Sequence, residues 1–254
     1  MAKDTAPALD ENTRRYYLDV MGVQCWQSLE PVSQQNVLHD GEPVAGPNTD
    51  SAAESEVEVP GNSWSVLERE VQNCDRCVLH ETRKQALLGR GSRSAELMFV
   101  LLAPDTSDDL MGMICSDAAD DLFARMLDAI DIEIDDVYIT SLLKCALPAS
   151  HTVTPKEIRC CTEHLKQQVQ LIQPELIVVL GETAIRCLLQ KDLTLDDYRA
   201  MNPETGSRDQ QHQFESVPLF VSYSPHELLR QVENKRKAWS DLQQLQAMMS
   251  AEQS

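Results

Sequence analysis

Two uninterrupted apolar runs constrain the fold of this chain more than any other feature. They lie within ELMFVLLA at 96–103 and ELIVVL at 175–180, and each is about as long as one strand. A strand with one face in water alternates apolar and polar residues, so unbroken runs predict strands that are buried on both faces. Such strands typically form a mostly parallel sheet with helices on both sides.

Segments with helical periodicity fall between these runs. We expect helices at about 63–74, 118–130, 154–173, 181–189 and 226–249, further strands around 137–139 and at 218–222, and loops at 104–112 and 192–216. Helices that alternate with buried strands favour parallel pairing and coverage of both sheet faces. The sequence therefore predicts an α/β domain over 63–250, with three layers, α/β/α, around a mostly parallel central sheet.

Helix-start signals support two of these boundaries. Either Ser63 or Ser65 can cap the first helix, and in the second case Glu68 completes a capping box. Thr154 can cap the helix that starts at Pro155, because proline suits the first helical turn.

The net charge limits the kinds of partner. The chain has 41 acidic and 22 basic residues, a formal charge of −19, which argues against a protein that coats DNA or binds anionic membranes. Any contact with nucleic acid must be local. The chain has no apolar run of about 18 residues and begins without a signal peptide, which predicts a cytoplasmic protein.

The N-terminal quarter differs from the rest in composition. Residues 28–62 contain seven acidic residues, four prolines and no lysine or arginine, which is typical of a disordered linker. We expect a peptide at 1–31, a disordered acidic linker at 32–62 and the domain after it. The aromatic segment before the linker either packs back on the domain as a helix or binds a partner. Its candidate anchors are Tyr17, Leu18, Met21 and Trp26.

Four of the eight cysteines are candidates for one metal site. Cys74 and Cys77 form a CxxC motif, which alone is a weak signal shared by zinc, redox and iron–sulfur sites. Cys145 follows the strand expected around 137–139, and Cys161 lies in the helix at 154–173. Four soft thiolates suit an iron–sulfur cluster or zinc. The alternative is that Cys145 and Cys161 are ordinary buried cysteines.

Helical spacing selects Cys161 over its neighbour. Cys161 shares an apolar stripe with Ile158 and Leu165, whereas Cys160 is rotated by about 100° from it. We therefore expect only Cys161 to face inward. The remaining cysteines have no comparable context and are read as incidental; they are Cys25, Cys115, Cys160 and Cys187.

The order of motifs resembles the iron–sulfur (family-four) uracil-DNA glycosylases. The resemblance covers about 65–245 and rests on the CxxC and on segments at 97–112, 136–148, 154–165, 174–184 and 222–230. It implies that family's α/β/α fold. It also implies that a four-iron four-sulfur cluster is held by Cys74, Cys77, Cys145 and Cys161.

The catalytic motifs of that family are altered here. Its first motif reads Gly-Glu-Ala-Pro-Gly, where this chain has Leu102 in place of the carboxylate and Asp105 at the end. Cys115 replaces an aromatic that stacks on uracil, Ser141 replaces an asparagine that reads the base, and Ser224 replaces a histidine that stabilises the leaving group. The resemblance thus implies no catalytic residues and a lost glycosylase activity.

A rearranged active site is the enzyme alternative. Asp108 and Asp109 remain in the first loop, and His226 lies two residues after Ser224. This alternative predicts an atypical uracil or damaged-base glycosylase in which Asp108 or Asp109 positions water.

The altered motifs and the N-terminal segment together resemble the psi subunits of bacterial DNA polymerase III. That resemblance implies a non-catalytic accessory subunit, whose N-terminal peptide binds the clamp loader and whose domain binds chi. Through chi it would contact single-stranded DNA-binding protein, with little or no DNA binding of its own. A third alternative is a repair accessory protein whose cluster senses redox state.

Overall fold

The computed structural model describes residues 63–148, 150–200 and 212–252. The peptide at 1–31 and the linker at 32–62, with the anchors Tyr17, Leu18, Met21 and Trp26, lie outside these residues. In the described part, six strands form a sheet in the order β1-β3-β2-β4-β6-β5. Their bounds are β1 Arg90–Gly91, β2 Leu97–Leu101, β3 Tyr138–Ser141, β4 Leu176–Leu180, β5 Gln213–Phe214 and β6 Val217–Ser222.

The four central strands are parallel, as the apolar runs predict. Strands β3, β2, β4 and β6 pair in parallel, whereas the two-residue strands β1 and β5 pair antiparallel at the edges. Every residue of β2 and β4 is buried. The strands that carry the sequence signal therefore form the centre of the sheet.

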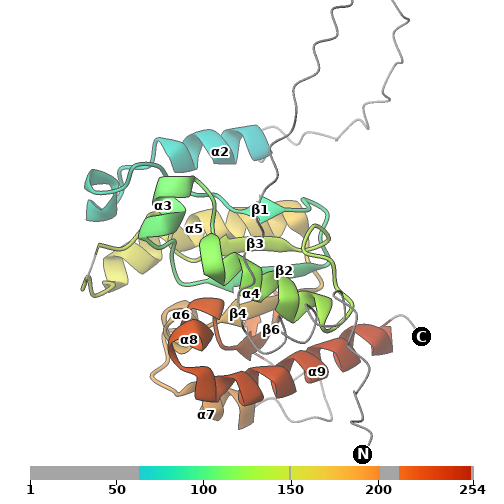
Figure 1. The fold of residues 1–254 in the computed structure, drawn as a ribbon. Helices are drawn as coiled ribbons and strands as arrows, with labels where there is room; N and C mark the ends of the chain where they lie inside the picture. Colours follow the sequence, from blue (N-terminus) through green and yellow to red (C-terminus); the bar gives the residue numbers. More distant parts are fainter. Residues whose placement is uncertain (1–62, 149, 201–211, 253–254) are drawn as a thin grey trace, which may run out of the picture. The chain divides into compact units, whose positions relative to one another are not determined.

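Helices cover both faces of the sheet (Figure 1). One face packs against α2 (Trp64–Gln72), α5 (Pro155–Ile172), α6 (Glu182–Leu189) and α7 (Leu195–Ala200); the other packs against α4 (Asp117–Asp128), α8 (Pro225–Arg230) and α9 (Lys235–Glu252). Side chains alternate along the strands, so that Met98 and Val100 join the first core and Phe99 joins the second. The expected three-layer α/β/α architecture is confirmed.

The expected loops contain additional elements. Helix α3 (Thr106–Met111) lies within 104–112, and α7 and β5 lie within 192–216. Asp105 and Asp108 form a capping box at the start of α3, and Gly112 ends the helix in the left-handed conformation. Two 3₁₀ turns also occur, η1 (Val78–Glu81) and η3 (Val232–Asn234).

The last helix is not continuous, contrary to expectation. Ser224 and Glu227 form a capping box that starts α8, and the helix ends at Gln231, where ψ is 80°. The turn η3 then leads into α9. Ser63, one of the two expected caps, caps α2, and Glu68 pairs with Arg93 and forms no capping box with Ser65.

Every helix in the described part of the chain is too short or too polar to serve as a membrane span.

Candidate functional site

A cavity of about 540 Å³ opens at the carboxyl ends of β2 and β4. In the sheet, β3 lies on one side of β2 and β4 lies on the other side. The loops that follow β2 and β4 therefore diverge, and ligands of open α/β sheets bind at such a switch point. The start of α8 supplies another wall. Lining residues include Leu101, Leu102, Asp105, Leu147, Leu180, Gly181, Ser224, His226 and Arg230.

Gly181 shapes the wall between β4 and α6. Its φ is +102°, a conformation that residues with a Cβ rarely adopt, and this lets the chain turn directly from the strand into the helix. A Cβ at this position would approach the Glu227 carboxylate at 3.2 Å. The cavity wall thus requires glycine here.

Asp105, Asp108 and His226 form an acid–histidine group at this cavity. Their ligand atoms lie within 4.8 Å of one another. The capping box of α3 fixes both aspartates, while the first turn of α8 presents His226. Nε2 of His226 lies 3.3 Å from Oδ2 of Asp105.

The two aspartates of this group differ in their availability. Asp108 is fully buried, and its Oδ1 accepts hydrogen bonds from the backbone N–H and the hydroxyl of Ser116, each at 2.7 Å. Oδ1 of Asp105 accepts the Asp108 N–H at 2.8 Å, but Oδ2 faces His226. The Asp105 side chain is 46% exposed, whereas that of His226 is 22% exposed. Asp105 therefore has one carboxylate oxygen, Oδ2, that is not held by the loop and contacts His226, whereas Asp108 mainly holds the loop.

Asp109 is likewise committed to structure. Its carboxylate accepts hydrogen bonds from the backbone N–H groups of Lys84 and Gln85, at 2.9 to 3.1 Å. The enzyme alternative assigned the positioning of water to Asp108 or Asp109. Both carboxylates already accept hydrogen bonds that hold the surrounding loops. The geometry favours Asp105 instead.

The five positions that we expected to depart from the glycosylase motifs fall into two groups. Leu102, Asp105 and Ser224 line the cavity, and the Ser224 hydroxyl accepts the Glu227 N–H as the cap of α8. Cys115 and Ser141 are fully buried and are not among its lining residues. The Ser141 hydroxyl donates to the carbonyl of Leu143 at 2.7 Å, and burial raises the pKa of the Cys115 thiol to about 12.

The four cysteines expected to bind metal come from three parts of the chain. Cys77, Cys145 and Cys161 pack together with Leu79 and Leu143 in a small core of their own. Cys77 precedes η1, Cys145 follows β3, and Cys161 lies on the buried stripe of α5. Cys74 lies close enough to Cys77 and Cys145 for its charge to raise the pKa of both thiols. Cys160 points elsewhere, and its thiol donates to the carbonyl of Arg76.

Two arginines and one lysine surround these thiols. Burial lowers the pKa of the lysine, Lys144, to about 7, so the two guanidinium groups of Arg76 and Arg83 carry the fixed positive charge. Arg83 donates to Sγ of Cys145 at 2.9 Å and to the carbonyl of Cys74 at 2.9 Å. Arg76 is hydrogen-bonded to Cys74, and the fully buried Lys144 lies near Cys161. Burial raises the pKa of Cys161 to about 11, so a bound metal must favour its thiolate. Positive charge around four thiolates fits an anionic metal–sulfur group.

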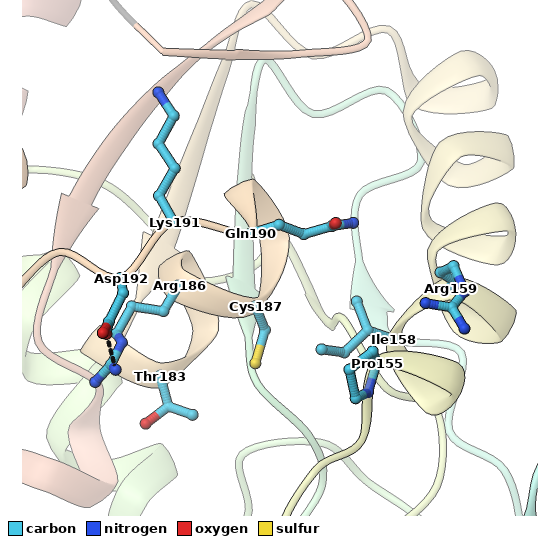
Figure 2. A pocket seen from close by; sticks show the side chains of 9 residues that line it. All are labelled: Pro155, Ile158, Arg159, Thr183, Arg186, Cys187, Gln190, Lys191 and Asp192. Carbon is cyan, nitrogen blue, oxygen red and sulfur yellow. Dashed lines mark hydrogen bonds and ion pairs between the residues drawn. The ribbon is translucent and has the colours of Figure 1, made fainter.

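A second cavity, of about 510 Å³, lies between α5 and α6. Figure 2 shows Ile158 and Pro155 on α5 across from Cys187 on α6, with Arg186 paired to Asp192 at one side. Burial raises the pKa of the Cys187 thiol, which makes it a poor nucleophile. Asp192, the carboxylate that lines this cavity, is paired with Arg186, and Arg159 and Lys191 are the other charged lining residues.

The fold and the switch-point cavity define an α/β protein with a ligand site next to a cysteine cluster. Residues 88–243 match the family model of the uracil DNA glycosylase superfamily, and the chain belongs to that family.

Type-4 uracil-DNA glycosylases are among its relatives. The chain is 40% identical over 116 residues to the enzyme from Archaeoglobus fulgidus, covering 46% of this chain and 58% of the relative. It is 33% identical over 120 residues to the enzyme from Pyrobaculum aerophilum, covering 47% and 61%. The enzyme from Thermotoga maritima is 32% identical over 120 residues, covering 47% and 62%. The chain thus spans less than two thirds of the length of these relatives.

These relatives overturn the prediction of a non-catalytic psi-like subunit. Five type-4 uracil-DNA glycosylases match at 32% to 40% identity, and they support the enzyme alternative instead. The psi interpretation compared motifs position by position. It treated Ser224 as evidence that the catalytic histidine is lost. In the structure, however, His226, two residues later on α8, lines the same cavity.

Proposed function

We propose that this chain is an iron–sulfur DNA glycosylase that removes uracil from DNA. The observation that carries the proposal is the pairing of Asp105 with His226 inside a cavity at the switch point of the sheet. The printed names of the relatives support uracil in DNA as the substrate.

The proposed reaction is hydrolysis of the bond between the base and C1′ of the sugar. A water oxygen attacks C1′ and loses one proton to the Asp105 carboxylate. The C1′–N1 bond breaks, and its electron pair leaves with the base as a uracil anion, which gains a proton from solvent after release. Oδ2 of Asp105 accepts a hydrogen bond from the water and stabilises the positive charge that develops on the sugar. His226 donates a hydrogen bond to the leaving base and stabilises its negative charge.

The other cavity walls suit an extruded base. Leu101, Leu102 and Leu147 supply apolar surface against which a base can pack without water. A glycosylase must extract its target nucleotide from the base stack, and an unpaired or single-stranded base costs least to extract. We therefore expect uracil in single-stranded DNA to be the better substrate.

The cysteine cluster completes the proposal. Cys74, Cys77, Cys145 and Cys161 would hold a four-iron four-sulfur cluster, which supplies four iron–thiolate bonds as a structural cross-link. This chain's thiols would thereby fasten η1 and the loop after β3 to α5. A cytoplasmic location, where thiols stay reduced, fits this ligand set.

The test is release of free uracil by the full chain purified with its iron. The substrate is an oligonucleotide with one uracil, single-stranded or paired, and strand cleavage at the abasic product is the readout. We expect Asp105→Asn to lower the rate by about 10²- to 10⁴-fold, the range of a lost acid–base group. Asp135→Asn, an exposed carboxylate on the segment between α4 and β3, is the matched control and should retain the rate. No release by an iron-loaded, folded protein would overturn the proposal.

A further inference from the structure

Exposed apolar side chains gather next to the cavity. In the described part of the chain, three of the large exposed apolar residues fall within eleven positions: Leu229, Val232 and Trp239. Trp239 is 44% exposed. With the exposed cations Arg230, Lys235 and Arg236 they form a surface that we name the α8–α9 patch. An exposed apolar patch with polar residues at its rim is typical of a binding surface.

The geometry of α9 places its aromatic and cationic groups on one face. Trp239 follows Lys235 by four residues and Arg236 by three, so the three side chains share a side of the helix. Ala238, Leu242 and Leu245 recur at intervals of four and three along α9 and are buried against the sheet. Trp239 lies beside this buried stripe, with 44% of its surface exposed.

The patch is cationic in a chain of net charge −19. Arg230, Lys235 and Arg236 outnumber Glu233, the one carboxylate between positions 229 and 239. Lys237 is excluded from this count because its ammonium pairs with Asp196 at 2.8 Å. An acidic protein that binds a phosphate backbone needs such a local cationic surface.

The patch is continuous with the switch-point cavity. Leu229 and Arg230 belong to the patch and also line the cavity, and α8 leads through η3 into α9 (Figure 1). A DNA strand that places one base in the cavity therefore has a direct path along the patch.

We propose that the α8–α9 patch binds the single-stranded DNA that flanks the extruded nucleotide, with one base stacked on Trp239 and adjacent phosphates held by Lys235 and Arg236. The inference rests on the proposed function for the position of the strand. Base stacking on an aromatic side chain combined with nearby cations is the usual means of binding single strands without sequence preference. The charge of the patch favours this anionic occupant over an apolar protein partner.

The test measures binding of undamaged single-stranded DNA to the full chain by fluorescence anisotropy. Trp239→Ala should weaken binding by about 5- to 150-fold, the range found for one lost stacking contact, and Trp239→Phe should restore most of the affinity. The Lys235→Gln/Arg236→Gln double variant should reduce the slope of log K against log salt by about 1.4, because each phosphate contact on a single strand contributes about 0.7.

Two controls make the result specific to the patch. Arg69→Gln/Arg125→Gln removes two exposed cations from α2 and α4 and should change the affinity little. A thermal melt of each variant shows whether it is folded, and none of the five substituted residues contributes to the buried core.

The outcomes separate this inference from the proposed function. Because the DNA contains no uracil, Trp239-dependent binding supports the patch even if no base is released. If uracil is released but affinity and salt slope are unchanged in folded variants, the patch inference is overturned. A dimer seen by sedimentation that Trp239→Ala dissociates, without any loss of DNA affinity, would assign the patch to a second copy of the chain and also overturn it.

Discussion

Nε2 of His226 lies 3.3 Å from Oδ2 of Asp105, although one residue follows β6 and the other follows β2. Two capping boxes produce this contact. One fixes Asp105 at the start of α3, and the other fixes the first turn of α8, which carries His226. Because β2 and β6 flank β4 in a parallel sheet, both helix starts lie at the same edge and face the same cavity.

Asp108 should matter for stability more than for chemistry. Replacing it by alanine removes a buried acceptor from the N–H and hydroxyl of Ser116 and breaks the capping box of α3. We expect a loss of about 2–3 kcal/mol in the free energy of unfolding, measured by urea denaturation. Asp135→Ala is the control, with an expected change below about 0.5 kcal/mol. A folded Asp108→Ala protein of unchanged stability would contradict the structural role.

The adjacent cysteines of α5 should behave differently. Cys161 packs with Cys77 and Cys145, whereas the Cys160 thiol points to the carbonyl of Arg76. Cys161→Ser should lose iron and acid-labile sulfide and melt at a lower temperature, because metal binding and folding are coupled. Cys160→Ser should keep both the metal and the melting temperature. Equal metal content in the two variants would remove Cys161 from the ligand set.

Arg83 should set the charge balance of the cluster. Its guanidinium donates to Sγ of Cys145 and also to the carbonyls of Gln72 and Cys74. Arg83→Gln removes a positive charge beside a ligand sulfur, so the reduction potential of the cluster should become more negative in protein-film voltammetry. Arg83→Lys should recover part of the shift, and Arg69→Gln should leave the potential where it is. A potential that does not respond to Arg83→Gln would show that the contact has no electrostatic role.

Glu157 should make the anchoring of α5 sensitive to acid. Burial would raise the pKa of this carboxyl, but hydrogen bonds from Thr154 and His151 outweigh burial and lower the pKa below its ordinary value of 4.5. A carboxyl with a lowered pKa in the folded state stabilises the protein above pH 4.5 and loses this contribution as the pH falls through the folded-state value. The stability difference between wild type and Glu157→Gln should therefore shrink below pH 4.5 in urea titrations. Carboxyl groups titrate roughly between pH 3 and 7. If the stability difference between wild type and Glu157→Gln did not change over this range, the assignment would be contradicted.

The sequence predicts the sheet and its layers because each signal is local. Buried runs identify β2 and β4, and Thr154 with Pro155 marks the start of α5. The helical stripe correctly places Cys161 inward and Cys160 outward. The short α3 was missed because its capping signal, Asp105 to Asp108, lies in a polar segment without apolar periodicity.

The candidate site depends on contacts between distant segments, which local patterns do not reveal. Motif comparison identifies Leu102 and Ser224 as departures, but the pairing of Asp105 with His226 follows from the order of β2, β4 and β6. A local signal for part of it exists, since Ser224-Pro225-His226-Glu227 is a helix-start pattern that predicts α8. The cations around the thiols likewise converge from separate elements.

The most direct test of the account is a double-mutant cycle on Asp105 and His226, read out as the single-turnover rate of uracil release from single-stranded DNA. If the two side chains act as one unit, Asp105→Asn and His226→Gln should each lower the rate by at least about 100-fold, and the double variant should be no slower than the slower single variant. Two results would contradict the paired mechanism. One is a rate near that of wild type in the folded single variants, and the other is a rate loss in the double variant that equals the product of the two single losses.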